Sequence, residues 1–335
     1  MKRQAWARVI VLGSLVLGAS IIGAPYRAGA QESPAALFGV YMDSPQTGWV
    51  VGRRGVILNT TNGGKSWIVQ SSGVRSDLRM LLFLDLRVGW AVGDAGVILS
   101  STSNGALWNR RLSDTEAGLR SVYFLPNGPK DGYVVGENGT ILISHDSGHT
   151  WESKPSGVTT RLNDVFFLDA ATGWAVGDGG VIVTTVDRGG HWTPVSSPTP
   201  VNLNSVLFTS TDGWIVGDGG TVLHSPAVPG DRLGTTWTAQ TLEAGRLFDI
   251  YFLPKSATGW ILGEKSVLFK TTDKGLNWEA GGVYGPAGSG IANAVAFAAG
   301  DGEDVFGWAV TTTGSILFSN DGGGSWKEQF RYRPK

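Results

Sequence analysis

Two series of tryptophan residues recur along this chain of 335 residues and constrain its fold more than any other feature. The first series follows a glycine each time and comprises Trp49, Trp90, Trp174, Trp214, Trp260 and Trp308, with Tyr133 in third place. The second comprises Trp67, Trp108, Trp151, Trp192, Trp237, Trp278 and Trp326. Paired members are 18 residues apart, except that an insertion around 226–233 widens the fifth pair to 23. Successive units are 40 to 48 residues apart, so the chain contains seven copies of one unit.

Each unit has the pattern of four short strands. In the fourth unit these are Leu162–Leu168, Gly173–Gly177, Val181–Thr185 and Trp192–Ser196. The segments are rich in β-branched and aromatic residues and are bounded by Gly, Asp, Asn or Ser, as strands are. Four-stranded units of this length, repeated radially, are typical of propeller blades. We therefore predict an all-β fold, a seven-bladed β-propeller of four-stranded antiparallel blades over residues 31–335, with the tryptophans packed between neighbouring blades.

A second pattern marks the turn between the third and fourth strands. It reads Ser144-x-Asp146-x-Gly148-x-Thr150 before the second tryptophan of the third unit, and it resembles the Asp-box of bacterial sialidases and related propellers. An Asp side chain can bond to backbone groups a few residues on and so close such a turn. We interpret the acidic position as structural rather than catalytic. Its occupants are Asn62, Asp146, Asp187, Asp273 and Asp321, while the second unit is degraded and the fifth is interrupted.

The first thirty residues have the pattern of a signal peptide. Lys2, Arg3 and Arg8 precede an apolar run over 9–24, and Ala28-Gly29-Ala30 supplies small residues for cleavage before Gln31. The alternative is an uncleaved N-terminal anchor, although the run is short for a span, which needs about 20 residues. Both interpretations place the propeller outside the cytoplasm, in a periplasm or lumen. Removal of residues 1–30 takes away four basic residues and no acid, so the net charge falls from −1 to −5.

Composition excludes several classes of function. A net charge of −1 argues against a nucleic-acid partner, because such proteins usually carry a strong positive balance. The absence of Cys removes disulfides, thiolate metal sites and a Cys nucleophile. The four His are scattered, and the sequence lacks a nucleophile elbow, a P-loop and a dinucleotide fingerprint. We therefore predict no catalytic residue, no metal and no cofactor.

The unit resembles the repeat of the photosystem II stability and assembly factor family. Residues 121–151 and 163–192 match it closely, and the resemblance covers about 35–330. Members are seven-bladed propellers of the thylakoid lumen, with relatives in bacteria that lack photosystem II. The resemblance implies a non-enzymatic protein that binds a subunit of a membrane complex, with membrane association through that partner or an N-terminal anchor. This sequence lacks the Cys that anchors the cyanobacterial lipoprotein members.

The resemblance also implies an arginine-rich patch that contacts the partner. By strand position, the matching residues are those that open the first strand of a unit: Arg79, Arg120, Arg161 and Arg246. On the same face, the turns between the second and third strands carry Arg53, Asp94, Glu137, Asp178, Asp218 and Glu264. An alternative follows from this proximity, because each arginine could pair with a neighbouring turn carboxylate and form an internal ion pair. The sequence leaves both open.

A carbohydrate-active or sialidase-like propeller is the alternative function. A glycosidase needs two carboxylates roughly 5–10 Å apart, and Asp94, Asp178 and Asp218 could supply them. Each of these, however, is the ordinary turn residue of its repeat. A sialidase also needs a Tyr nucleophile, whereas the tyrosines mostly occupy strand positions of the repeat. We therefore favour protein binding.

Overall fold

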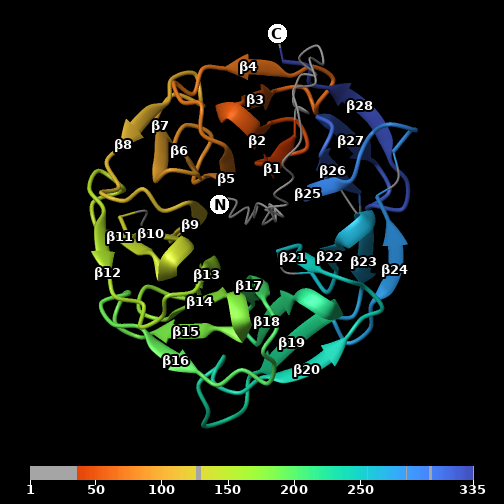
Figure 1. Ribbon diagram of the computed structural model, residues 1–335. Helices are drawn as coiled ribbons and strands as arrows, with labels where there is room; N and C mark the ends of the chain where they lie inside the picture. Colours follow the sequence, from red (N-terminus) through yellow and green to blue (C-terminus); the bar gives the residue numbers. More distant parts are fainter. Residues whose placement is uncertain (1–35, 126–129, 255, 284, 302–303, 335) are drawn as a thin grey trace, which may run out of the picture.

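The computed structural model describes residues 36–125, 130–254, 256–283, 285–301 and 304–334. These residues form seven four-stranded antiparallel sheets arranged as the blades of a ring, which confirms the predicted seven-bladed β-propeller (Figure 1). The region 1–30, predicted as a signal peptide or anchor, lies outside the described residues. In the described part of the chain, no helix has the length and apolar character needed to span a bilayer.

Each blade is one continuous stretch of chain. Blade 1 contains β1 (Leu37–Met42), β2 (Gly48–Gly52), β3 (Ile57–Thr60) and β4 (Ile68–Gln70), and blade 2 contains β5 (Leu78–Phe83), β6 (Gly89–Gly93), β7 (Val97–Ser101) and β8 (Asn109–Arg111). Blade 3 contains β9 (Leu119–Phe124), β10 (Gly132–Gly136), β11 (Ile141–Ser144) and β12 (Glu152–Lys154), and blade 4 contains β13 (Leu162–Phe167), β14 (Gly173–Gly177), β15 (Ile182–Thr185) and β16 (Thr193–Val195).

The remaining blades follow the same order. Blade 5 contains β17 (Leu203–Phe208), β18 (Asp212–Gly217), β19 (Thr221–Pro226) and β20 (Thr238–Thr241), and blade 6 contains β21 (Leu247–Phe252), β22 (Gly259–Gly263), β23 (Val267–Thr271) and β24 (Glu279–Gly282). Blade 7 contains β25 (Ala292–Ala299), β26 (Val305–Thr311), β27 (Ser315–Ser319) and β28 (Lys327–Arg331). The first strand of each blade lies nearest the centre of the ring and the fourth lies at its rim (Figure 1).

Short 3₁₀ turns join the second and third strands in five blades: η1 (Arg53–Gly55), η2 (Glu137–Gly139), η3 (Asp178–Gly180), η4 (Asp218–Gly220) and η5 (Glu264–Ser266). The middle residue of each turn has a left-handed backbone conformation, with φ of +71° at Gly179 and +66° at Gly219. Glycine adopts this conformation without steric cost, whereas other residues are strained by it.

Aromatic rings hold neighbouring blades together. Trp49 of blade 1 stacks on Phe83 of blade 2 with ring centroids 3.6 Å apart, and Trp151 of blade 3 meets Trp90 of blade 2 edge-on at 6.0 Å. Tyr133 stacks on Phe167 in the same way at 3.6 Å, which explains why a tyrosine can replace tryptophan in the third unit. Both tryptophan series therefore contribute to the packing between blades, as the sequence predicts.

The ring closes between blades 7 and 1 by side-to-side packing rather than by exchange of a terminal strand, since each sheet contains only its own four consecutive strands within the described residues. The Asn293 amide donates to the Leu37 carbonyl oxygen at 2.7 Å, and the Gln329 amide donates to the Gly63 carbonyl oxygen at 2.9 Å. Closure therefore rests on buried apolar contact and a few polar bonds between the first and last blades.

Candidate functional site

One face of the ring gathers the turns between second and third strands and the first residues of the innermost strands. Asn163 of β13 shows the arrangement, because its amide donates both to Asp178 in η3 at 3.0 Å and to the Leu203 carbonyl of the next blade at 2.8 Å. Asn204 repeats the pattern toward Asp218, with 3.0 Å between the amide nitrogen and the carboxylate. The predicted arginines lie at this face, around the central channel.

Arg79 contacts two carboxylates and an aromatic ring. Its side chain is 8% exposed, and its Nε donates to an Asp94 carboxylate oxygen at 2.9 Å. One amino group also contacts Asp94, and it lies 3.4 Å from Asp77. The guanidinium carbon is 4.7 Å from the centre of the Phe38 ring, a distance typical of a cation–π contact. Arg79 thus joins its own blade to blade 1.

Arg120 is buried and has N–H groups that make no hydrogen bond to the described residues. Its side chain is 9% exposed and forms an ion pair with Glu137 of its own blade, and a second nitrogen lies 3.9 Å from Asp94 of blade 2. Its Nε and its Nη1 make no hydrogen bond to any described residue. A buried guanidinium with unsatisfied N–H groups is costly, and it can bind an incoming acceptor oxygen without breaking an existing bond.

Arg161 and Arg246 are more exposed and are also paired. Arg161 donates to Asp178 of its own blade at 3.1 Å. Arg246 of blade 6 pairs instead with Asp218 of blade 5, with 2.7 Å between Nε and the carboxylate oxygen. The four predicted arginines therefore take part in internal ion pairs, which is the alternative that the sequence left open. Their contact with a partner stays a prediction, and the carboxylates beside them reduce the positive potential of this face.

A buried polar belt in the channel escaped the sequence analysis. Asp164 of β13 is buried and accepts hydrogen bonds from the Ser121 hydroxyl at 2.8 Å and from the Val206 backbone N–H at 2.9 Å, so it links blades 3, 4 and 5. Asp249 accepts from Ser205 and continues the belt into blade 6. The sequence carried a sign of this arrangement, because Asp164 and Asp249 are the third residues of their innermost strands, where blade 7 has Ala294. These carboxylates hold blades together.

The Asp146 carboxylate organises the turn after β11. One oxygen accepts from the Ser144 hydroxyl at 2.8 Å and the Thr150 N–H at 2.9 Å, and the other accepts from the Thr150 hydroxyl at 2.7 Å. Desolvation raises the pKa of Asp146, but these hydrogen bonds lower it more, to about 2. The carboxylate is thus fully ionised and turned into its own loop.

The other predicted box positions share this geometry. Asp187, Asp273 and Asp321 each accept from a hydroxyl two residues before and from a backbone N–H four residues after. Hydrogen bonds lower the pKa of Asp187 and Asp273 to about 2. At Asp321 desolvation raises the pKa, but the hydrogen bonds lower it more, also to about 2. Asn62 forms the same turn with an uncharged side chain, which accepts from the Ser66 N–H at 3.0 Å and donates to the Ser66 hydroxyl at 2.9 Å. The structural role of these five residues stays a prediction.

Three histidines of the described residues each contact one aspartate. His145 lies 2.8 Å from Asp131, which Arg188 also contacts, and His224 lies 2.8 Å from Asp212. Among the residues that the structure describes, no group of three or more His, Asp or Glu is placed to hold a metal ion.

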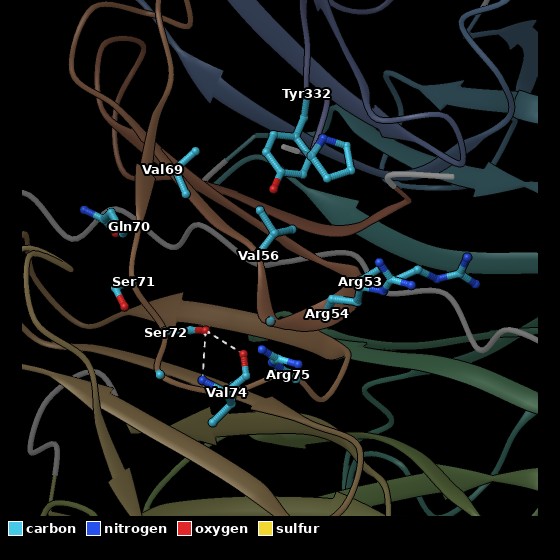
Figure 2. Close-up of a pocket in the computed structure, with 13 residues that line it drawn as sticks. Arg53, Arg54, Val56, Val69, Gln70, Ser71, Ser72, Val74, Arg75 and Tyr332 are labelled. Atoms are coloured by element: carbon cyan, nitrogen blue, oxygen red, sulfur yellow. Dashed lines mark hydrogen bonds between the residues drawn. The ribbon is translucent and has the colours of Figure 1, made fainter. Parts of the chain in front are cut away.

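A pocket on the same face of the ring was also missed. Its volume is about 370 Å³, and it lies between η1, the loop after β4 and the end of the chain. Figure 2 shows Tyr332 on one side, Val69 on another, and Arg53 and Arg54 across from them. Arg75 completes the charged lining. The pocket is lined by residues more than 250 positions apart, so the pattern within one repeat does not reveal it. The sequence carried one indication of it, because Arg53 occupies a position that is acidic in most other repeats.

The fold and this face define a class: a seven-bladed β-propeller whose loops surround a polar central channel. The sequence profile of the photosynthesis system II assembly factor YCF48 matches residues 27–118 and 156–244, more than half of the chain. The chain belongs to this family.

Solved structures agree on the fold. A structure described as YCF48 bound to D1 peptide is 20% identical, with a TM-score of 0.64 over 86% of this chain and 92% of that one. YCF48 from Cyanidioschyzon merolae is also 20% identical, with a TM-score of 0.63 over 86% of this chain and 96% of that one. No curated protein matches the sequence significantly.

A propeller enzyme is also similar in shape. An ancestral GH74 enzyme superposes with a TM-score of 0.70 at 12% identity, over 91% of this chain and 48% of that one. Such low identity shows the fold alone, because one fold supports many functions. The carbohydrate-active alternative therefore gains no argument from this similarity.

Proposed function

We propose that this protein is a non-enzymatic binding propeller that acts outside the cytoplasm as an assembly or accessory factor of a photosystem-like membrane complex. The observation that carries the proposal is family membership, established by the profile match over two long segments of the repeat array. The related propeller solved with a D1 peptide supports a protein segment as the partner. The N-terminal region 1–30, as a cleaved signal peptide or an anchor, supports export.

The proposed contact surface is the channel mouth that carries Arg79, Arg120, Arg161 and Arg246. Arginine suits such a surface because it stays charged and can hold a carboxylate with two parallel hydrogen bonds. Arg120 is the central candidate, since two of its nitrogens make no hydrogen bond to the described residues. A carboxylate or carbonyl oxygen of the partner would satisfy them and would add a third acceptor beside Glu137 and Asp94.

The test compares partner capture with stability in the same variants. We expect Arg120→Gln, and more strongly the combined change of all four arginines to Gln, to reduce recovery of a membrane subunit in a pulldown from solubilised membranes. The melting temperature of the quadruple variant should fall, because Arg79 and Arg120 are buried ion-pair partners, so capture is compared at a temperature at which each variant stays folded. Lys154→Gln is the matched control, since it removes an ion pair with Glu152 at the rim of the ring.

Two results would contradict the proposed surface. One is unchanged capture by a well-folded quadruple variant at low salt. The other is a loss of capture that follows a large fall in melting temperature and is restored by lowering the assay temperature, which would assign these arginines to stability alone.

A further inference from the structure

The turn η1 departs from its repeat in charge. The residue that follows the second strand is acidic in five of the other six blades: Asp94, Glu137, Asp178, Asp218 and Glu264. In blade 1 this residue is Arg53, and Arg54 and Gly55 follow it. Blade 1 therefore has two positive charges where blades 4 and 5 have the sequence Asp-Gly-Gly.

Arg54 is the middle residue of η1. Its φ is +56°, in the left-handed region, where blades 4 and 5 have Gly179 and Gly219. A side chain other than glycine is strained there. Blades 3 and 6 have the same conformation at Asn138 and Lys265, so η1 differs from the other turns in its charge rather than in its backbone.

The second observation is the pocket into which this turn projects. Its walls combine Val56, Val69 and Tyr332 with three arginines, Arg53, Arg54 and Arg75 (Figure 2). Among the described residues that line it, none is acidic. Arg54 and Arg75 are exposed and Arg53 is half-buried, and none of the three guanidinium groups pairs with a carboxylate of the described chain.

A neighbouring carboxylate, that of Asp77, is already engaged by other groups. Asp77 accepts from the Arg54 backbone N–H at 2.9 Å and forms an ion pair with Arg79 at 3.4 Å. This distinguishes the pocket from the channel mouth, where the predicted arginines already contact turn carboxylates. The positive charge of the pocket is therefore not neutralised from within, on a molecule whose overall balance is acidic.

The pocket opens beside an unusual edge strand. In β4, Ile68 is 67% exposed and Val69 is 60% exposed, and Val69 also lines the pocket. At these two positions the other blades have Asn-Arg, Glu-Ser, Thr-Pro, Thr-Ala, Glu-Ala and Lys-Glu. Charged residues and proline protect an edge strand from pairing with another chain, and two exposed β-branched residues invite it.

We propose that the outer edge of β4 and the adjacent arginine pocket form a binding site for an extended acidic segment of another protein. The segment adds a strand to blade 1 beside Ile68 and Val69, and its carboxylates enter the pocket toward Arg53, Arg54 and Arg75. Main-chain pairing supplies affinity in such complexes, and pockets for side chains supply specificity. A free small anion fits less well, because the pocket is large for one and has valine walls. The proposal is independent of the channel-mouth arginines.

Two variants remove the site by copying other blades. Arg53→Asp with Arg54→Gly turns η1 into the Asp-Gly-Gly turn of blades 4 and 5, which reverses the charge and relieves the strained backbone. Ile68→Thr with Val69→Pro copies Thr193-Pro194 of β16, which occupies the same register position. Because the fold already accommodates both sequences, both variants are expected to fold. Arg232→Asp, an exposed charge reversal in the blade 5 insertion, is the matched control.

The probe is a peptide selected by display of a random decapeptide library on the purified propeller, then synthesised with a fluorescent label. We expect the selected peptides to be rich in Asp or Glu and in β-branched residues. In fluorescence anisotropy, the η1 variant should weaken binding roughly tenfold or more and flatten its salt dependence, because charge-assisted contacts are lost. The β4 variant should weaken binding without changing the salt dependence, and Arg232→Asp should bind like the unaltered protein.

Several outcomes would overturn the proposal: no enriched peptide, enriched peptides without acidic residues, or equal binding by a folded η1 variant. Binding of vesicles with anionic headgroups that is lost in the η1 variant, without any peptide binding, would also overturn it and would assign the arginines to a membrane surface. None of these outcomes affects the pulldown with the channel-mouth variants, so the two proposals fail separately.

Discussion

Replacing Asp146 by alanine tests the structural role of the box carboxylates. The substitution removes the acceptor of three hydrogen bonds, from the Ser144 hydroxyl and from the N–H and hydroxyl of Thr150. Thr150 is exposed and can turn to water, whereas Ser144 is buried and loses its acceptor. The turn should therefore loosen without collapse of the blade.

The expected magnitude follows from the pKa of Asp146, which lies at about 2 against an ordinary value of 3.8. A difference of this size corresponds to about 2.5 kcal/mol of preferential stabilisation of the charged form. Solvent screens this exposed carboxylate, so we reduce the expected cost of Asp146→Ala to about 1 kcal/mol. For a domain of this size, that is a fall of about 2 °C in melting temperature.

The pH dependence provides a second test. Because the folded state lowers the pKa of Asp146, its contribution to stability is complete above about pH 4 and is lost as the pH falls toward 2. The difference in the free energy of unfolding between the unaltered protein and Asp146→Ala should therefore shrink between pH 4 and 2. Asp146→Asn is the control, since Asn62 shows that an amide can make the same turn. It should cost less at neutral pH.

Urea unfolding followed by tryptophan fluorescence at pH 7, 4 and 2.5 measures all three proteins, and the partner pulldown completes the assay. The structural interpretation fails if Asp146→Ala melts like the unaltered protein but no longer captures its partner, because the carboxylate would then be a binding group. It also fails if the cost is independent of pH down to 2.5.

Three further predictions concern stability. Gly148 and Gly157 have similar φ of +72° and +76°, but a methyl group at Gly148 would overlap the Trp90 ring while one at Gly157 meets no atom within 4 Å. Gly148→Ala should therefore cost at least about 2 kcal/mol more than Gly157→Ala in urea unfolding; equal costs would contradict the packing argument. Ser103→Asp should raise stability by about 0.5–1 kcal/mol, because it restores the carboxylate of a degraded box; no gain in melting temperature would count against it. Asp131→Asn should cost about 1–2 kcal/mol, since this buried carboxylate accepts from Arg188 of the next blade at 2.8 Å; a silent variant would show that the bridge is dispensable.

The fold could be predicted because the same sequence pattern recurs in every blade. The distance from the first to the second tryptophan is a property of one unit, and it is repeated often enough to reveal both the strands and their order. Boundaries were predicted less well: the fourth strand of blade 4 was expected at Trp192–Ser196 and is Thr193–Val195. Trp192 lies just before the strand, where its ring meets Phe167 edge-on at 5.9 Å. Its local sequence looked like strand, but its contact with another part of the blade decides its position.

The partner of each arginine could not be predicted. Arg161 pairs with Asp178 of its own blade, whereas Arg246 pairs with Asp218 of the preceding blade, although both open the innermost strand in the same way. The choice depends on which carboxylate lies within reach once neighbouring blades are packed. Repeat position gives the face on which a side chain lies, and not the group that it contacts.

The same reasoning explains why a departure from the repeat is more informative about function than the repeat itself. A residue that recurs in most blades is maintained by the geometry common to all blades, as the turn carboxylates and box carboxylates show. Arg53 has no such support, because it replaces an acid, and Arg54 adds a second positive charge where blades 4 and 5 have glycine. Together with Ile68 and Val69, they place a positive charge and an unprotected strand edge next to each other on blade 1 alone. Sevenfold similarity builds a stable ring, and the proposed strand-edge site depends on the residues by which blade 1 differs from the others.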